Sequence, residues 1–168
     1  MGFGEAIKVC FSKYFTFSGR ARRSEYWWFY LFTILLAIVA GIFDGILGLG
    51  TEDLGVLGGI ATLVTIVPTL SAQVRRLHDT GRSGWWVGAA FIAAIIFVIL
   101  IIGIAGVSGL GGTSDAFSGA MGIFFLIFIF AFLIYGIAML VFMCQDSHPG
   151  DNKYGSSPKY DSGASVFD

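Results

Sequence analysis

The chain has 168 residues, of which 56% are hydrophobic and only 12% are charged. Soluble domains carry about 25% charged residues, so this composition excludes an ordinary water-soluble protein. The net charge of -1 is small, but the charged residues are distributed unevenly along the chain, and that distribution predicts a membrane topology.

The first predicted element is a short amphipathic helix within residues 1–19. Apolar residues from Phe3 to Phe15 recur at helical spacing, and polar residues such as Lys8 fall on the opposite face. We expect this helix to end at Gly19. Its aromatic face and nearby lysines favour a place at the membrane interface, and packing beneath a helical bundle is the alternative.

Four long apolar stretches follow, each close to the ~20 residues that a membrane-spanning helix needs. The second contains Pro68 and is the shortest, but without it the basic segments on its two sides would lie across the membrane from each other. We therefore predict an all-α integral membrane protein, a four-helix bundle that forms a single domain over residues 1–168. The expected spans are residues 26–47, 54–71, 85–107 and 120–144.

The positive charges predict the orientation of these spans. All ten Lys and Arg residues lie before the first span, after the second or after the fourth. The other two loops, near residues 48–53 and 108–119, contain Glu52, Asp53 and Asp115 but no basic residue. The positive-inside rule therefore places both termini, and the polar tail of residues 145–168, in the cytoplasm. We expect the last residues of that tail to be loose.

The second span carries small and polar residues along one helical stripe. These residues are Gly58, Thr62, Thr65, Thr69 and Gln73. Such a stripe is typical of close helix packing, with hydroxyl groups bonded to nearby backbone carbonyls. A polar path for a solute along this helix is the alternative.

Two spans begin with a pair of tryptophans, at Trp27 and Trp85, where indole rings favour the headgroup level. A Gly-Arg dipeptide precedes each pair, at Gly19 and at Gly81. This similarity predicts two related helical hairpins of parallel orientation, with their basic segments side by side at the cytoplasmic surface.

Most of the chemically active side chains are expected to gather at that surface. The candidate site contains Arg20, Arg22, Arg23, Glu25, Arg75, Arg76, His78, Asp79 and Arg82. Arginine binds phosphate oxygens well, and each basic residue near the cytoplasmic leaflet attracts anionic lipid by about 1 kcal/mol. Because Glu25 and Asp79 neutralise only part of the charge, and Asp146 and Asp151 lie in a tail expected to be mobile, phosphate groups are the expected acceptors. The alternative is that the arginines set the topology and form ion pairs that fasten the hairpins together.

The sequence gives little support to other chemistries. His78, Asp79, Asp146 and His148 follow no metal-ligand spacing, and there is no nucleophile motif or phosphate-binding glycine loop. The arginine segments are short and close to the membrane, which disfavours nucleic-acid binding. We therefore expect no enzymatic activity, no cofactor, no metal and no nucleic-acid partner.

A coupled transporter usually carries an ionisable residue near the membrane midplane. The only acidic residue inside a predicted span is Asp44, roughly 27 Å along the helix from Tyr26 and so near the outer surface. This position favours an accessory protein over a transporter.

Three passages resemble a known family. They are FSGRARRSEYWW at residues 17–28, RRLHDTGRSGWW at residues 75–86, and GDNKYG at residues 150–155. Together they resemble the YhaH-like bacterial inner-membrane family, also called domain of unknown function 805. The segment after the third passage, Ser156-Ser157-Pro158, departs from the more acidic pattern expected before the proline.

The resemblance implies a small bacterial inner-membrane protein but no particular chemistry. We expect a non-enzymatic accessory or scaffold protein that binds anionic lipid headgroups or a membrane partner through the arginine cluster. A larger membrane complex or a homo-oligomer is the expected setting for such a protein. A small channel or transporter, or a subunit of one, is the alternative.

Overall fold

The computed structural model describes residues 1–49, 55–109 and 115–160, and the side chains of these except residues 104–109 and 115–120. Within this part of the chain there are five helices and no strand: α1 (Phe3–Ser12), α2 (Arg23–Leu47), α3 (Val56–Asp79), α4 (Trp85–Gly109) and α5 (Asp115–Cys144). The last four are long and apolar enough to cross a membrane. The predicted all-α membrane fold with four spans is confirmed, whereas the acidic residues Glu52 and Asp53 of the first expected outer loop lie outside the described residues.

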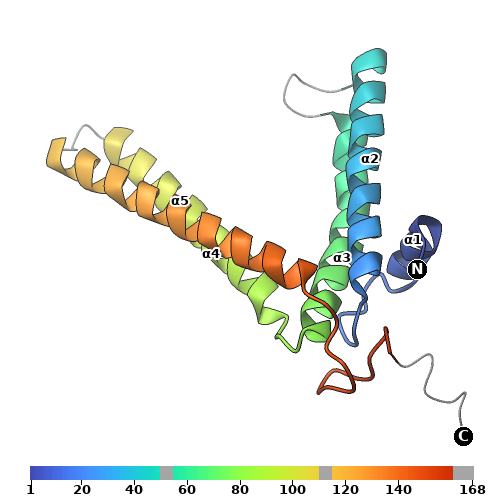
Figure 1. Ribbon diagram of the computed structural model, residues 1–168. Coiled ribbons are helices and arrows are strands. Elements are labelled where there is room, and N and C mark those ends of the chain that lie inside the picture. Colours follow the sequence, from blue (N-terminus) through green and yellow to red (C-terminus); the bar gives the residue numbers. More distant parts are fainter. Residues whose placement is uncertain (50–54, 110–114, 161–168) are drawn as a thin grey trace, which may run out of the picture. The chain divides into compact units, whose positions relative to one another are not determined.

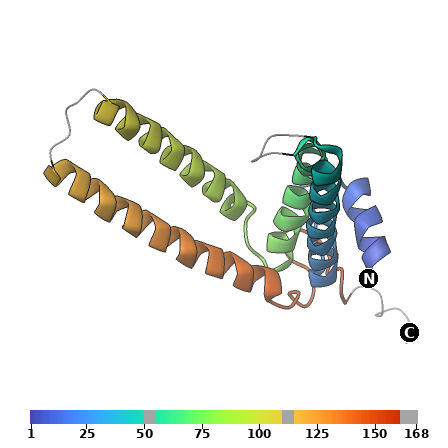
Figure 2. The ribbon, with the colours of Figure 1, turned by 90° about the horizontal axis from the view of Figure 1, so that it is seen from above.

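The chain divides into two compact units. The first comprises Met1–Gly84 with Met143–Asp168, and the second comprises Trp85–Phe142. In the first unit, α2 and α3 run side by side and α1 lies against one end of the pair (Figures 1 and 2). The second unit is the hairpin of α4 and α5. Whether the two units behave as one domain stays a prediction.

Helix α1 packs against α2 and α3, the other helices of the first unit, through small and aromatic residues. Ala6 and Cys10 are fully buried, and the ring of Phe11 meets Phe29 edge to face at 5.6 Å between centroids. The helix ends at Ser12, well before the predicted stop at Gly19. Lys13 leaves the helical conformation at this point, and its carbonyl accepts hydrogen bonds from the N–H of Thr16 (3.0 Å) and from Ser71 Oγ (3.2 Å).

Helix α3 continues past the predicted end of the second span and reaches Asp79. Proline has no backbone N–H, so Pro68 leaves the carbonyl of Val64, four residues earlier, without its helical partner. The hydroxyl of Tyr14 donates to this carbonyl at 2.9 Å. The kink-forming residue is therefore accommodated by a contact from the segment after α1, and Arg75 and Arg76 lie on a helix instead of in a loop.

At the other end of α3, a residue of α2 caps the helix. The carboxylate of Asp44 accepts hydrogen bonds from the backbone N–H groups of Leu57 and Gly58, both at 2.9 Å. The N-cap residue itself is Gly55, which has no side chain with which to cap. A Cβ atom at Gly55 would lie 2.0 Å from Asp44 Oδ2, so the two positions fit together only with glycine there.

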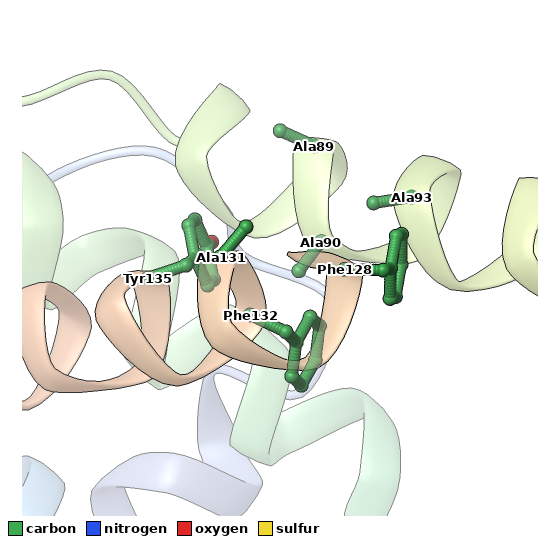
Figure 3. A pocket seen from close by; sticks show the side chains of 7 residues that line it. All are labelled: Ala89, Ala90, Ala93, Phe128, Ala131, Phe132 and Tyr135. Atoms are coloured by element: carbon green, nitrogen blue, oxygen red, sulfur yellow. The ribbon is translucent and has the colours of Figure 1, made fainter. Parts of the chain in front are cut away.

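In the second unit, aromatic side chains join α4 to α5. Phe97 stacks on Phe128 with 4.2 Å between ring centroids, and the Tyr135 hydroxyl donates to the carbonyl of Trp86. Small residues on α4 leave an apolar cavity of about 230 Å³ between the helices (Figure 3). Its lining residues are Ala89, Ala90, Ala93, Phe128, Ala131, Phe132 and Tyr135.

Candidate functional site

A group of buried charges that we call the buried ion cluster gathers around the C-terminal end of α3. It consists of Arg20, Glu25, Arg75, Arg76 and Asp79. All five are at most 6% exposed, although arginine and carboxylate side chains are rarely buried unless they are paired. All five belong to the set that the sequence predicted as a headgroup or partner site.

Asp79 lies at the centre of this cluster and is fully buried. One carboxylate oxygen accepts from Arg20 Nε at 2.9 Å, and the other accepts from Arg76 Nη1. Asp79 and Arg76 belong to the end of α3, and Arg20 belongs to the segment before α2. The Asp79 carboxylate therefore links these two segments. The alternative considered for the sequence was an ion pair that fastens the two hairpins together, but all three residues here lie in the first unit, so that alternative stays a prediction.

The remaining donors of Arg20 bind the tail. Its Nη2 donates to the carbonyl of His148 at 2.6 Å, and its Nη1 donates to those of Gly150 (2.7 Å) and Gly155 (3.1 Å). Gly150 and Gly155 have positive φ angles of 77° and 121°, which glycine adopts easily. The chain there curls so that its carbonyl groups meet one guanidinium.

Arg76 makes a second connection between α3 and the end of α5. Its Nε donates to the carbonyl of Met143 at 3.2 Å, and its Nη2 donates to the carbonyl of Gln145. Backbone carbonyls, together with Asp79, thus satisfy this buried arginine.

Arg75 and Glu25 form the other part of the cluster. Arg75 Nη1 donates to Glu25 Oε1, while Nε and Nη2 of the same arginine are buried and have no hydrogen-bond partner among the described residues. The Cys10 thiol lies beside this pair, and burial raises its pKa to about 11, with the Glu25 charge acting in the same direction. Burial and the raised pKa both favour the protonated thiol of Cys10 at neutral pH.

His78 helps to hold the tail. Its ring stacks on Tyr154 with 3.8 Å between centroids, and its Nδ1 lies 3.2 Å from the carbonyl of Gly19. Its own carbonyl accepts from the side-chain amide of Asn152 at 2.9 Å, and the carbonyl of Asp79 accepts from the N–H of His148 at 3.2 Å. Two of these residues, Asn152 and Tyr154, belong to the third passage that resembles the known family.

The tail carboxylates Asp146 and Asp151 were discounted as partners of the arginines, and among the described residues Asp146 pairs with Lys159 instead. The segment from Gln145 to Gly155 nevertheless provides acceptors for Arg20 and Arg76. The acceptors are backbone carbonyls, which a search for acidic side chains does not detect. The available signal was the density of turn-forming residues, since tight turns bring several carbonyl groups together. Residues 161–168, the end that was expected to be loose, lie outside the described residues.

The other predicted arginines lie at the edge of the cluster. Arg23 Nη1 donates to the carbonyl of Cys144 at 3.2 Å, and Arg82 Nη1 donates to Gln145 Oε1 at 2.6 Å. Arg22 is half-buried and Lys13 is exposed, and neither side chain makes a hydrogen bond or ion pair with any described residue. Lys13 and Arg22, like the exposed Lys8, thus have no protein acceptor among the described residues.

The threonines of the predicted stripe on α3 use their hydroxyl groups in hydrogen bonds within the helix. The hydroxyl groups of Thr62, Thr65 and Thr69 donate to carbonyls four residues earlier in the same helix, at 2.9, 2.7 and 2.7 Å. Thr65 is buried, Thr69 and Gln73 are half-buried and Thr62 is exposed. The N–H of Gly58 binds Asp44, as described above. The hydroxyl donors are thus already used within the helix.

No group of three potential metal ligands occurs in the part of the chain that the structure describes. His78 and Asp79 are adjacent in sequence but bind different groups, an aromatic ring and two arginines.

Comparison with known proteins agrees with the resemblance found in the sequence. The family model described as "Protein of unknown function (DUF805)" matches residues 14–156. The chain belongs to this family. Inner membrane protein YhaH of Escherichia coli (strain K12) is 35% identical over 149 residues, which cover 87% of this chain and 89% of that protein. Inner membrane protein YhaI of the same organism is 32% identical, with 89% and 91% covered. No solved structure matches the chain.

The region matched by the DUF805 model includes the whole buried ion cluster and the tail residues that bind it. These relatives are named inner membrane proteins, and this chain has four helices that are long and apolar enough to cross a membrane. Both observations indicate a membrane protein.

Proposed function

We propose that this DUF805 protein is a non-enzymatic accessory protein of the bacterial inner membrane, with both termini in the cytoplasm, whose cytoplasmic surface binds anionic lipid headgroups. The observation that carries the proposal is a contrast between two groups of its cations. Arg20, Arg75 and Arg76 are buried and bonded to protein groups, whereas Lys13 and Arg22 lie at the surface without a protein acceptor among the described residues.

The buried cations support a scaffold role. They join the segment before α2, the end of α3 and the tail into one assembly through Asp79, Glu25 and several carbonyls. A buried ion pair with further hydrogen bonds gives a fixed geometry, which suits a surface that presents other residues to a partner. The surface cations are then available to phosphate oxygens, which arginine binds well.

Two contacts weigh against the channel or transporter alternative. Asp44, the acidic residue of the first span, accepts two backbone hydrogen bonds as a helix cap. The threonine hydroxyls of α3 donate to carbonyls of their own helix. Both kinds of group would have to leave these bonds in order to bind a solute or an ion.

The test is purification in a gentle detergent followed by mass spectrometry of bound lipids and proteins. We expect anionic phospholipid to be enriched over the zwitterionic lipid of the same membrane. Stoichiometric recovery of a larger membrane complex without lipid enrichment would assign the surface to a protein partner instead. Ion or solute flux in liposomes that contain only this protein would overturn the accessory role.

A further inference from the structure

A polar pocket of about 320 Å³ opens beside the two surface cations, between α1, the segment before α2 and the tail. Its walls include Lys13 from the end of α1, Arg20 and Arg22 from the following segment, and Glu25 from the first turn of α2. The remaining lining residues are Met1, Glu5, Val9, Ser12 and Pro158. The pocket belongs entirely to the first unit.

Three of the five charged side chains in the pocket wall already have hydrogen-bond partners within the protein. Arg20 is bonded to Asp79 and to the tail, Glu25 accepts from Arg75, and Glu5 accepts from the backbone N–H of Gly2 at 3.2 Å. The two cations that remain, Lys13 and Arg22, have no described acceptor. An occupant that carries negative charge therefore gains two new partners and breaks none of these bonds.

The position of the pocket in the chain indicates which kind of anion it would bind. Arg22 is the N-cap of α2, the first candidate span, so the pocket lies where the chain begins its first passage through the membrane. The same two helices, α1 and α2, also carry exposed aromatic residues: the ring of Phe3 meets the indole of Trp28 edge to face at 5.9 Å. Exposed aromatic residues at the start of a span mark the headgroup level, where lipid phosphates are the abundant anions.

We propose that this pocket binds the phosphate of one anionic phospholipid, with Lys13 and Arg22 as its donors and the aromatic surface of Phe3 and Trp28 against the adjoining acyl region. This inference rests on the proposed function and names its binding site. Two members of the buried ion cluster, Arg20 and Glu25, line the pocket but keep their own partners within the protein. The cluster also holds the segment that carries Arg22, because the N–H of Ala21 donates to the carbonyl of Arg75 at 3.0 Å.

The experiment uses native mass spectrometry of the full chain in detergent, titrated with phosphatidylglycerol or with phosphatidylcholine. The test variant is Lys13→Gln with Arg22→Gln, and the matched control is Lys8→Gln with Lys153→Gln, which removes the same charge outside the pocket. The parent and the control should retain one tightly bound phosphatidylglycerol. The test variant should bind it about thirtyfold more weakly, since each basic residue contributes about fivefold. The thermal midpoints of all three proteins should agree.

Each other outcome overturns a defined part of the account. Equal retention by test variant and parent would refute the pocket and leave general headgroup binding intact. A parent that prefers neither lipid would refute the proposed function as well. Displacement of the lipid by millimolar inorganic phosphate would assign the pocket to a soluble phosphate compound, and equal losses in the test and control variants would reduce the effect to net charge.

Discussion

Single residues in this protein complete hydrogen bonds that the helices leave open. Tyr14 donates to the carbonyl of Val64, which Pro68 leaves without a helical donor, and Asp79 accepts hydrogen bonds from two arginines. In each case one side chain joins segments that are distant in sequence, so single substitutions should have effects beyond their own element.

The contact between Tyr14 and Val64 gives a first prediction. Tyr14→Phe should lower the free energy of unfolding by about 1 kcal/mol, because the carbonyl of Val64 then has no donor. In a Pro68→Ala background the new N–H supplies the helical bond, so the same substitution should have a smaller effect. Unfolding of the four proteins in detergent measures this coupling. Equal effects in both backgrounds would mean that the tyrosine does not compensate for the proline.

The central carboxylate gives a second prediction. Asp79→Asn leaves two buried arginines without their counter-charge and should destabilise the protein by about 3–5 kcal/mol. It should also release the tail and expose the bond after Lys153 to trypsin. Asp151→Asn, at an exposed residue of the same tail, is the control and should change neither property. A tail that stays protected in Asp79→Asn would show that Arg20 holds it without the ion pair.

At the scale of the helices, the spans themselves could be predicted from apolar length, whereas their ends could not. Where α1 stops, the carbonyl of Lys13 accepts from Ser71, and where α3 continues past Pro68, the carbonyl of Val64 accepts from Tyr14. Both contacts join residues fifty or more positions apart, which periodicity and local propensity do not contain.

The cap of α3 gives a third prediction. Asp44→Ala should cost about 1 kcal/mol of stability, because two N–H groups at the start of α3 lose their acceptor. Gly55→Ala should be at least as damaging, since its Cβ would displace the Asp44 carboxylate. The double variant should be close to the worse single variant. Additive losses, measured by thermal unfolding in detergent, would contradict a shared cap.

At the scale of the whole molecule, the residues of the candidate site were predicted more accurately than their roles. The five buried residues come together as expected, and Arg20, Arg75 and Arg76 find acceptors inside the protein. Their role depended on carbonyl groups of the tail, which side-chain composition does not reveal. The cation most relevant to the proposed lipid site, Lys13, was outside the predicted set, because it joins Arg22 only once α1 folds against α2.

The central claim is that the ion cluster and the pocket lie on the cytoplasmic side, where they meet the inner leaflet. The direct measurement is a set of fusions to a reporter pair that is active on opposite sides of the membrane. Fusions after Phe17, Thr80 and Asp168 should report the cytoplasm, and fusions after Thr51 and Thr113 should report the periplasm, because the basic residues all lie in the first set of segments. Periplasmic activity of the Thr80 fusion, which follows the cluster residue Asp79 directly, would contradict the account.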